Sequence, residues 1–222
     1  RIMAAIGRFQ KGDEIFYGKV VDGDLYKLRG DVFGSPSFDK KPTPIKGVRT
    51  LVPVQPSKII AVGLNYADHA RETGKALPKE PLFWIKATTS LIPDGGKIEL
   101  PFPQHRNDFE AELAIIIGRR IRNIAAAAAS RYILGYTAAQ DVTDRTIQAS
   151  DGQWCRCKSF DTFTPLGPYV ETKTRWKKER VLNIINVSDN IRHSSGEEIK
   201  IELGKDSRFI WEFGFKHPCE FR

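Results

Sequence analysis

The chain has 222 residues, of which 41% are hydrophobic, and this is enough for one sizeable core or for a main domain with a small second one. It has no run of about 18 apolar residues, so neither a transmembrane helix nor a secretory signal is expected, and a cytoplasmic protein without a membrane partner is predicted. The net charge of +8 is spread over short clusters, whereas a nucleic-acid-binding surface favours longer basic stretches interleaved with aromatic residues. Small acidic substrates would suit the same charge.

The first 55 residues are expected to form a small β-rich domain. Three strands, IMAAIGRF, EIFYGKVV and DLYKL, are joined by the turn sequences KGD and DGD. Residues 34–47 contain three prolines and two glycines and are predicted to be a linker. A buried strand, KIIAVGL, follows and is expected to end at Gly63. Residues 56–222 would then form a second, larger domain.

A short helix is predicted over residues 65–74. Asn65 can cap its first turn, Asp68 completes a capping box, and Gly74 ends it. Isolated helices shorter than about 12 residues are marginal in water. We therefore expect this helix to become ordered only when something docks on it.

The remaining elements follow from periodicity and turn signals. The alanine run at 125–129 favours the first turns of a helix. The C-x-C pair of Cys155 and Cys157 would lie on one face of a strand, and with Cys219 it leaves no second pair for a zinc site, so reduced thiols are expected. The other predicted elements are a strand and turn at 81–92, a strand entering the core at 109–118, a strand at 137–142, a short helix or turn at 144–150, and a proline-bounded edge strand at 163–170.

Two glutamates stand at the start of the apolar stretch DFEAELAIIIG, residues 108 to 118. On a strand, Glu110 and Glu112 share one face. Two like charges in one space repel, and one tends to take up a proton unless a cation lies between them. Asp141 lies near the end of another predicted strand, and three carboxylates suit a hard ion such as Mg²⁺ or Mn²⁺.

Each of these patterns also has a structural alternative. An E-x-E pattern is more often a solvated strand face with lysine or arginine partners. His69 and Glu72 are neighbours on a helix, where the carboxylate can orient the imidazole as a general base, but such pairs are commonly surface residues. Lys158, taken by itself, indicates an exposed side chain.

Five segments occur in a specific order: AVGLNYADHARETG, PLFWIKATTSLI, NDFEAELAIIIGRRIRN, GYTAAQDVTDRTIQ and DGQWCRCKSFDTFTPLGPYV. Together they resemble the fumarylacetoacetate hydrolase (FAH) family, most of all its acylpyruvate hydrolase, 2-hydroxyhepta-2,4-diene-1,7-dioate isomerase and 5-oxopent-3-ene-1,2,5-tricarboxylate decarboxylase members. The resemblance covers residues 57–172, whereas the tail 173–222 is unmatched, so a truncated or altered C-terminus is expected. The start at Arg1 likewise indicates an incomplete chain.

The resemblance implies an α+β fold, with a mixed rolled β-sheet core and few helices behind a small β-rich N-terminal domain, and a homodimer. It implies Mg²⁺ or Mn²⁺ as cofactor, with Ca²⁺ as a substitute. Gln140 and Thr146 depart from the asparagine and the acid that the family commonly has there. The implied roles are metal binding by Glu110, Glu112 and Asp141, catalysis by His69, Glu72 and Lys158, and substrate binding by Arg145, Gln148 and Lys86.

The function that the resemblance implies is metal-dependent hydrolysis of C–C bonds in small 2-oxo or 1,3-dioxo carboxylic acids, or their decarboxylation or isomerisation. His69 with Glu72 would activate water on a lid that closes over the substrate. One alternative is an inactive relative that only binds metal or an acidic ligand. Another is a basic nucleic-acid-binding module, which the scattered charge disfavours.

Overall fold

The computed structural model describes residues 5–64, 74, 76 and 78–172. These divide into two compact units. The first contains the described residues up to 55, residues 113–138 and the residues from 166 onward, and the second contains the described residues of 56–112 and 139–165. The boundary after residue 55 coincides with the expected one, but the two later segments group with the N-terminal residues. The predicted helix at 65–74 lies outside the described residues except for Gly74.

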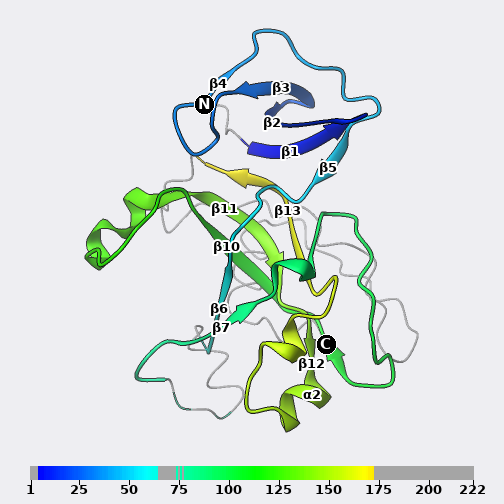
Figure 1. Cartoon of the computed structure of the whole chain (residues 1–222), viewed down its shortest axis with the longest axis vertical. Coiled ribbons are helices and arrows are strands. Elements are labelled where there is room, and N and C mark those ends of the chain that lie inside the picture. Colours follow the sequence, from blue (N-terminus) through cyan, green and yellow to red (C-terminus); the bar gives the residue numbers. More distant parts are fainter. Residues whose placement is uncertain (1–4, 65–73, 75, 77, 173–222) are drawn as a thin grey trace. The chain divides into compact units, whose positions relative to one another are not determined.

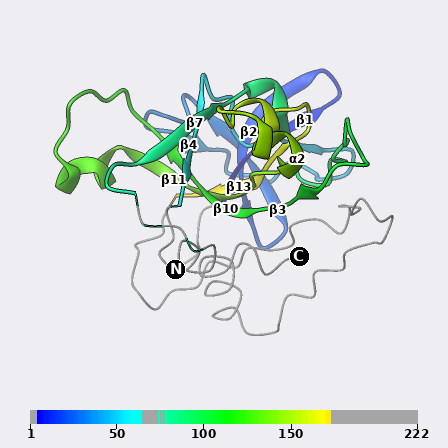
Figure 2. The ribbon, with the colours of Figure 1, turned by 90° about the horizontal axis from the view of Figure 1, so that it is seen from below.

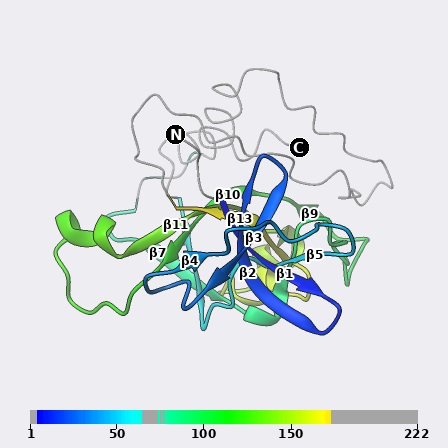
Figure 3. The same ribbon diagram turned by 90° about the horizontal axis from the view of Figure 1, so that it is seen from above.

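The N-terminal strands follow the sequence closely. They are β1 (Ala5–Lys11), β2 (Glu14–Val21), β3 (Asp24–Arg29), β4 (Ser37–Phe38) and β5 (Arg49–Leu51). The three predicted strands are confirmed, and Figure 3 shows β1 and β2 as a long blue hairpin. Their core is formed by Phe9, Phe16 and Leu25.

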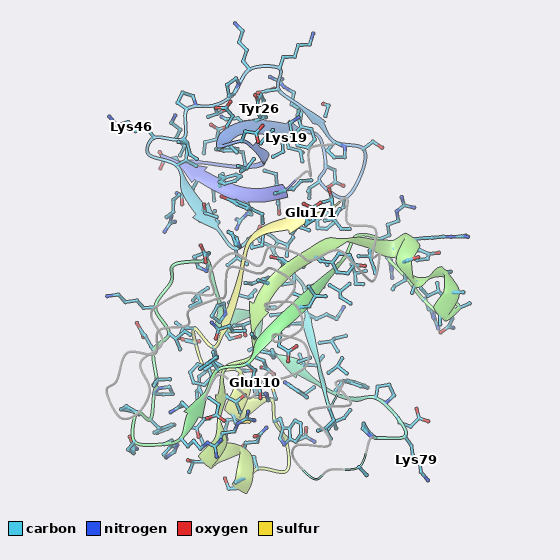
Figure 4. The ribbon with its side chains drawn as sticks, turned by 180° about the vertical axis from the view of Figure 1, so that it is seen from behind. Lys19, Tyr26, Lys46, Lys79, Glu110 and Glu171 are labelled. Carbon is cyan, nitrogen blue, oxygen red and sulfur yellow. The ribbon has the colours of Figure 1, made fainter. Side chains whose placement is uncertain are left out.

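The predicted linker at 34–47 contains one strand that the sequence did not indicate. Ser37 and Phe38 pair with β3, opposite Arg29 and Leu28. Phe38 also lies beside Lys19, whose ammonium is 4.9 Å from the centre of the Phe38 ring and 5.1 Å from that of Tyr26. Figure 4 shows Lys19 and Tyr26 together on these strands. Such contacts order a segment whose composition alone favours a loop.

The rest of the described chain is mainly β-structure with a few short helices, so the predicted α+β class is confirmed. The elements are β6 (Ile59–Gly63), β7 (Leu82–Lys86), η1 (Thr88–Ser90), β8 (Leu91–Ile92), β9 (Asn107–Asp108), β10 (Ala111–Ile117), η2 (Ala126–Tyr132), β11 (Ile133–Gln140), β12 (Thr143–Asp144), α2 (Arg145–Ser150), η3 (Arg156–Lys158) and β13 (Thr164–Glu171). None of the helices in the described part of the chain has the length and apolarity needed to cross a membrane.

The largest sheet is mixed and has the strand order β10-β11-β13-β1-β2-β3-β4, with β5 also paired to β1 and β8 paired in parallel to β13. Figure 2 shows β10, β11 and β13 near one another. The predicted edge strand at 163–170 is therefore wrong, because β13 has neighbours on both sides. Both of its prolines, Pro165 and Pro168, precede Val170 and Glu171, which pair with Ile6 and Ala5.

The strands β6 and β7 form a separate antiparallel pair with one apolar face exposed. The prediction of a buried strand at 58–64 was wrong in this respect, since Ile60 is 56% and Val62 44% exposed. They pair with Ile85 and Phe83, which are also exposed. The opposite face of β7 buries Trp84 and Lys86, so this pair delivers a lysine into the interior of the second unit.

Of two further local predictions, one was confirmed and one was wrong. The alanine run forms a helix as predicted, the 3-10 helix η2. Cys155 and Cys157 flank the start of η3 instead of lying in a strand. Cys157 is buried, and burial raises the pKa of its thiol to about 11, whereas Cys155 is exposed.

Candidate active site

The predicted carboxylates lie in the second unit. Glu110 and Glu112 stand at the start of β10, and Asp141 directly follows the end of β11. The backbone N–H of Asp141, which follows β11, donates to the carbonyl of Glu110 at 3.0 Å. This bond brings the two acidic segments together, as the sequence predicted. Figure 1 shows β12 and α2 next to one another, and Figure 4 shows Glu110 among the side chains near α2.

Lys158 lies between two of the carboxylates. Its Nζ donates to Glu110 Oε2 at 2.8 Å, to Asp141 Oδ2 at 2.7 Å and to Thr143 Oγ1 at 2.7 Å. Burial opposes the charge of this side chain, which is 2% exposed, but attraction from Asp141 and Glu110 outweighs it and raises the pKa of Lys158. The expectation of an exposed lysine from the isolated residue is therefore wrong, and Lys158 is a buried ammonium.

Lys86 approaches the same acid from β7. Its Nζ donates to Asp141 Oδ1 and, at 3.2 Å, to the carbonyl of Phe163. Burial lowers the pKa of Lys86 even though Asp141 favours the charged form. Asp141 is thus bonded to one lysine through each of its oxygens.

Arg145, the first residue of α2, binds three side chains at once. Its Nε donates to Asp108 Oδ2 at 2.8 Å, its Nη1 to Gln148 Oε1 at 2.8 Å, and its Nη2 to Glu110 Oε1. Burial opposes its charge, but the carboxylates of Glu110 and Asp108 raise its pKa. Two of the three residues predicted to bind substrate, Arg145 and Gln148, are therefore adjacent, and Arg145 also contacts a predicted metal ligand.

The carboxylate of Glu110 is consequently ionised. Burial favours its protonated form, but Lys158 and Arg145 lower its pKa. The alternative of a strand face with basic partners describes these contacts correctly, but not the solvation, because the Glu110 side chain is only 13% exposed. The charges are held inside the second unit and not on its surface.

Glu112 differs from its neighbours because it makes no ion pair with any residue in the described part of the chain. Burial, together with the nearby charges of Glu110 and Asp141, raises its pKa to about 8. This is the repulsion that the E-x-E spacing predicted. The positive charges of Lys158 and Lys86 lower the pKa of Glu112 but offset only part of this increase.

Helix α2 is anchored by a residue that we did not single out. Asp144 is fully buried, and its Oδ1 accepts from the backbone N–H of Ile147 at 2.9 Å, which caps the helix. Its Oδ2 bonds to His105 Nδ1 at 2.7 Å. Asp108 was missed as well, although the spacing D-x-E-x-E places it on the same side as the two glutamates. The sequence signals were an aspartate directly before a helix and a third acid in alternation.

The carboxylates of Glu110, Glu112 and Asp141 are the type of donor that a hard divalent ion prefers. In the described residues, however, no group of three or more His, Cys, Asp or Glu side chains is arranged to hold a metal ion. The ammonium of Lys158 stands between Glu110 and Asp141, where it bonds to both. His69 and Glu72 lie outside the described residues.

Three comparisons place these features in context. An uncharacterized protein of Archaeoglobus fulgidus is 46% identical over 166 residues, covering 74% of this chain and 62% of that protein. The 5-carboxymethyl-2-hydroxymuconate delta-isomerase of Mycobacterium smegmatis has a similar structure, with a TM-score of 0.69, 38% identity and coverage of 77% of this chain and 68% of that one. For the fumarylacetoacetate hydrolase of Exiguobacterium antarcticum the TM-score is 0.66, the identity 29% and the coverage 76% and 66%.

The chain therefore spans less than two thirds of the length of the A. fulgidus relative. The family described as fumarylacetoacetate (FAA) hydrolase C-terminal matches residues 58–202. This range contains all nine residues to which the resemblance gave a role. It is also more than half of the chain, and the solved relatives share its fold, so the chain belongs to the fumarylacetoacetate hydrolase family.

Proposed function

We propose that the protein is a metal-dependent enzyme that hydrolyses C–C bonds in small 2-oxo or 1,3-dioxo carboxylic acids of the acylpyruvate type. The observation that supports this most is Glu112, a partly buried carboxyl group beside Glu110 and Asp141 with no ion pair in the described part of the chain. A buried charge without a partner is costly, and a divalent cation would remove that cost. Membership of the family supports the same conclusion.

Mg²⁺ or Mn²⁺ is the ion proposed, held by Glu110, Glu112 and Asp141, with Ca²⁺ as a substitute. All-oxygen ligation favours these hard ions over zinc. Such an ion, when bound, would chelate the keto and carboxylate oxygens of the substrate and would stabilise the negative charge that develops as the C–C bond breaks.

Lys158 is proposed to donate a hydrogen bond to the oxygen on which negative charge develops. Its pKa is raised, so it remains an ammonium at neutral pH and suits a donor better than a general base. The side chains of Arg145 and Gln148 are hydrogen-bonded to each other. They are proposed to bind the substrate carboxylate through their terminal N–H groups. Lys86 neutralises the second oxygen of Asp141 and is proposed to lie at the rear of the substrate pocket.

Hydrolysis also requires an activated water molecule. We propose that His69, oriented by Glu72, activates it. Decarboxylation and isomerisation need the enolate but not that water. A site of this kind is compatible with both the isomerase and the hydrolase among the similar structures. A homodimer is proposed on the family resemblance.

The decisive experiment measures turnover of an acylpyruvate and of oxaloacetate with Mg²⁺ or Mn²⁺ and again after EDTA. We expect EDTA to abolish turnover and Glu110→Gln to reduce it by roughly 100-fold or more, as when one charge-stabilising group is lost. Glu14→Gln is the matched control, because Glu14 is exposed on β2 and its carboxylate pairs with Lys27, outside the candidate site. Turnover that survives EDTA would refute the metal site.

A second candidate is an inactive relative that only binds metal or an acidic ligand. It is favoured by Lys158 and Arg145, which already bond to Glu110 or Asp141 and compete with a catalytic ion for these carboxylates. Calorimetry distinguishes the two. Binding of Mn²⁺ without turnover of either substrate would select the inactive relative.

A further inference from the structure

Asp108 is a buried acid held between two arginines. Arg106 contacts it with both Nε, at 3.1 Å from Oδ1, and Nη2, at 2.9 Å from Oδ2. Arg145 contacts Oδ2 from the other side at 2.8 Å. The Asp108 side chain is only 11% exposed, and both of its oxygens accept hydrogen bonds from guanidinium groups.

The contact with Asp108 uses only the Nε of Arg145. A guanidinium group is planar and its donors form a rigid fork, so a bond at Nε fixes the direction of Nη1 and Nη2. These two atoms reach Gln148 and Glu110. Asp108 therefore sets the orientation of the part of Arg145 that faces the proposed site.

Backbone hydrogen bonds fix the position of the segment that carries Asp108 relative to α2. The N–H of Arg145 donates to the carbonyl of Arg106 at 2.8 Å, and the N–H of Arg106 donates to Thr146 Oγ1 at 3.2 Å. Asp108 also pairs with Thr143 in the β9–β12 ladder. The acid and the helix that bears Arg145 are thus fixed by contacts that do not involve Glu110.

We propose that Asp108 is a positioning residue for carboxylate recognition, and the proposal rests on the function proposed above. A metal ion that binds Glu110 competes with Arg145 for that carboxylate. Asp108 would then hold Nε, and with it the direction of Nη2, so that Nη2, once released by Glu110, donates to the carboxylate of the keto acid. Loss of the Asp108 charge leaves Arg145 without this second anchor.

The test compares Asp108→Asn with Asp151→Asn. Asp151 accepts a two-point contact from Arg156 at 2.8 and 2.6 Å, at the opposite end of α2, and so has the same chemistry away from Arg145. We expect Asp108→Asn to raise KM for an acylpyruvate about tenfold with kcat changed less than about twofold, because a hydrogen bond to a charged group is lost. Asp151→Asn should change neither constant.

A purely structural role is excluded by the choice of ligand. Oxalate has the carboxylates that Arg145 would recognise, whereas acetylacetone has the chelating oxygens and no carboxylate. Calorimetry in Mn²⁺ should show oxalate binding weakened about tenfold by Asp108→Asn and acetylacetone binding unchanged. Equal weakening of both ligands, or of neither, would overturn the proposal.

A double-mutant cycle with Arg145→Gln gives an independent check. If Asp108 acts through Arg145, then Asp108→Asn has no further effect on oxalate binding once Arg145 is replaced, whereas additive losses would overturn the proposal. Asp108→Glu, which keeps the charge, should restore most of the oxalate affinity, and it serves as the folded variant if Asp108→Asn is unstable. Because oxalate binding is measured without turnover, a failed activity assay refutes the enzymatic function and leaves this test intact.

Discussion

Glu112 couples the stability of the metal-free protein to pH. Its folded pKa of about 8 lies above its ordinary value of 4.5, so folding takes up a proton between these two values and stability falls as pH rises through that window. One pKa unit corresponds to about 1.4 kcal/mol, so the loss between pH 5 and pH 7 is on the order of 3 kcal/mol.

Urea unfolding in EDTA at both pH values measures this loss. Glu112→Gln should remove the pH dependence and make the metal-free protein more stable at pH 7, because it deletes the repelling charge but keeps the shape. Saturating Mn²⁺ should remove the dependence in the unaltered protein as well. An identical pH profile for the protein and the Glu112→Gln variant would contradict the assignment.

At the level of residues, the sequence predicted the convergence of acids but not their partners. The alternation of Glu110 and Glu112 is a property of neighbouring positions, which a sequence displays directly. The bond from Lys158 to Glu110 joins residues 48 positions apart, and only the fold creates it. Lys158 was assigned a role through the family resemblance, since nothing in CRCKSFD itself indicates a buried ammonium.

Among the elements, β11 and β13 approach so closely at Gly135 that no other residue fits there. A Cβ at Gly135 would lie 2.7 Å from Val170 Cγ1 and closer still to the carbonyl oxygen of Glu171. The backbone on that side cannot move without opening the pairing of the two strands. Gly135→Ala should therefore destabilise the protein by about 2 to 3 kcal/mol or prevent folding.

Gly152→Ala is the matched control, because a Cβ there meets nothing within 4 Å. Thermal unfolding followed by circular dichroism should place Gly135→Ala well below the unaltered protein and Gly152→Ala close to it. Equal melting temperatures for the two variants would show that the strands separate more easily than their contact implies.

The elements predicted well are those specified by short-range signals. β1 to β3 are short segments separated by glycine-containing turns, so their bounds agree with the prediction within a few residues. The errors concern tertiary placement: β4 forms because β3 offers it an edge, and β13 is interior because β1, β8 and β11 pair with it. A proline-rich composition does not contain that information.

For the whole molecule, metal binding should appear as added stability. A ligand that binds only the folded state stabilises it by about 2.7 kcal/mol at a concentration 100 times its dissociation constant. We expect Mn²⁺ and Mg²⁺ to raise the melting temperature, with no rise in Glu110→Gln. A rise of equal size in that variant would place the ion elsewhere on the chain.

The family assignment came from the order of motifs over the whole chain and was confirmed by the match to residues 58–202. No single motif was specific, since E-x-E and H-x-x-E occur widely on ordinary surfaces. Their sequence along the chain is informative because one fold has to bring all of them to one place. The division into two units was only half foreseen, since residues 113–138 return to the N-terminal unit through β10 and β11.

The indole of Trp84 lies directly beneath the ammonium of Lys158, 4.9 Å from it, and packs edge-on against Trp154. A positive charge so near an indole alters its excited state, so this ring is a natural optical reporter of where that ammonium stands. A ligand that moves the Lys158 ammonium away from Glu110 and Asp141 should change the fluorescence of Trp84. Subtracting the spectrum of the Trp84→Phe variant separates this fluorescence from that of the other tryptophans. The protein can thus be watched in solution while its charges rearrange, without any attached dye.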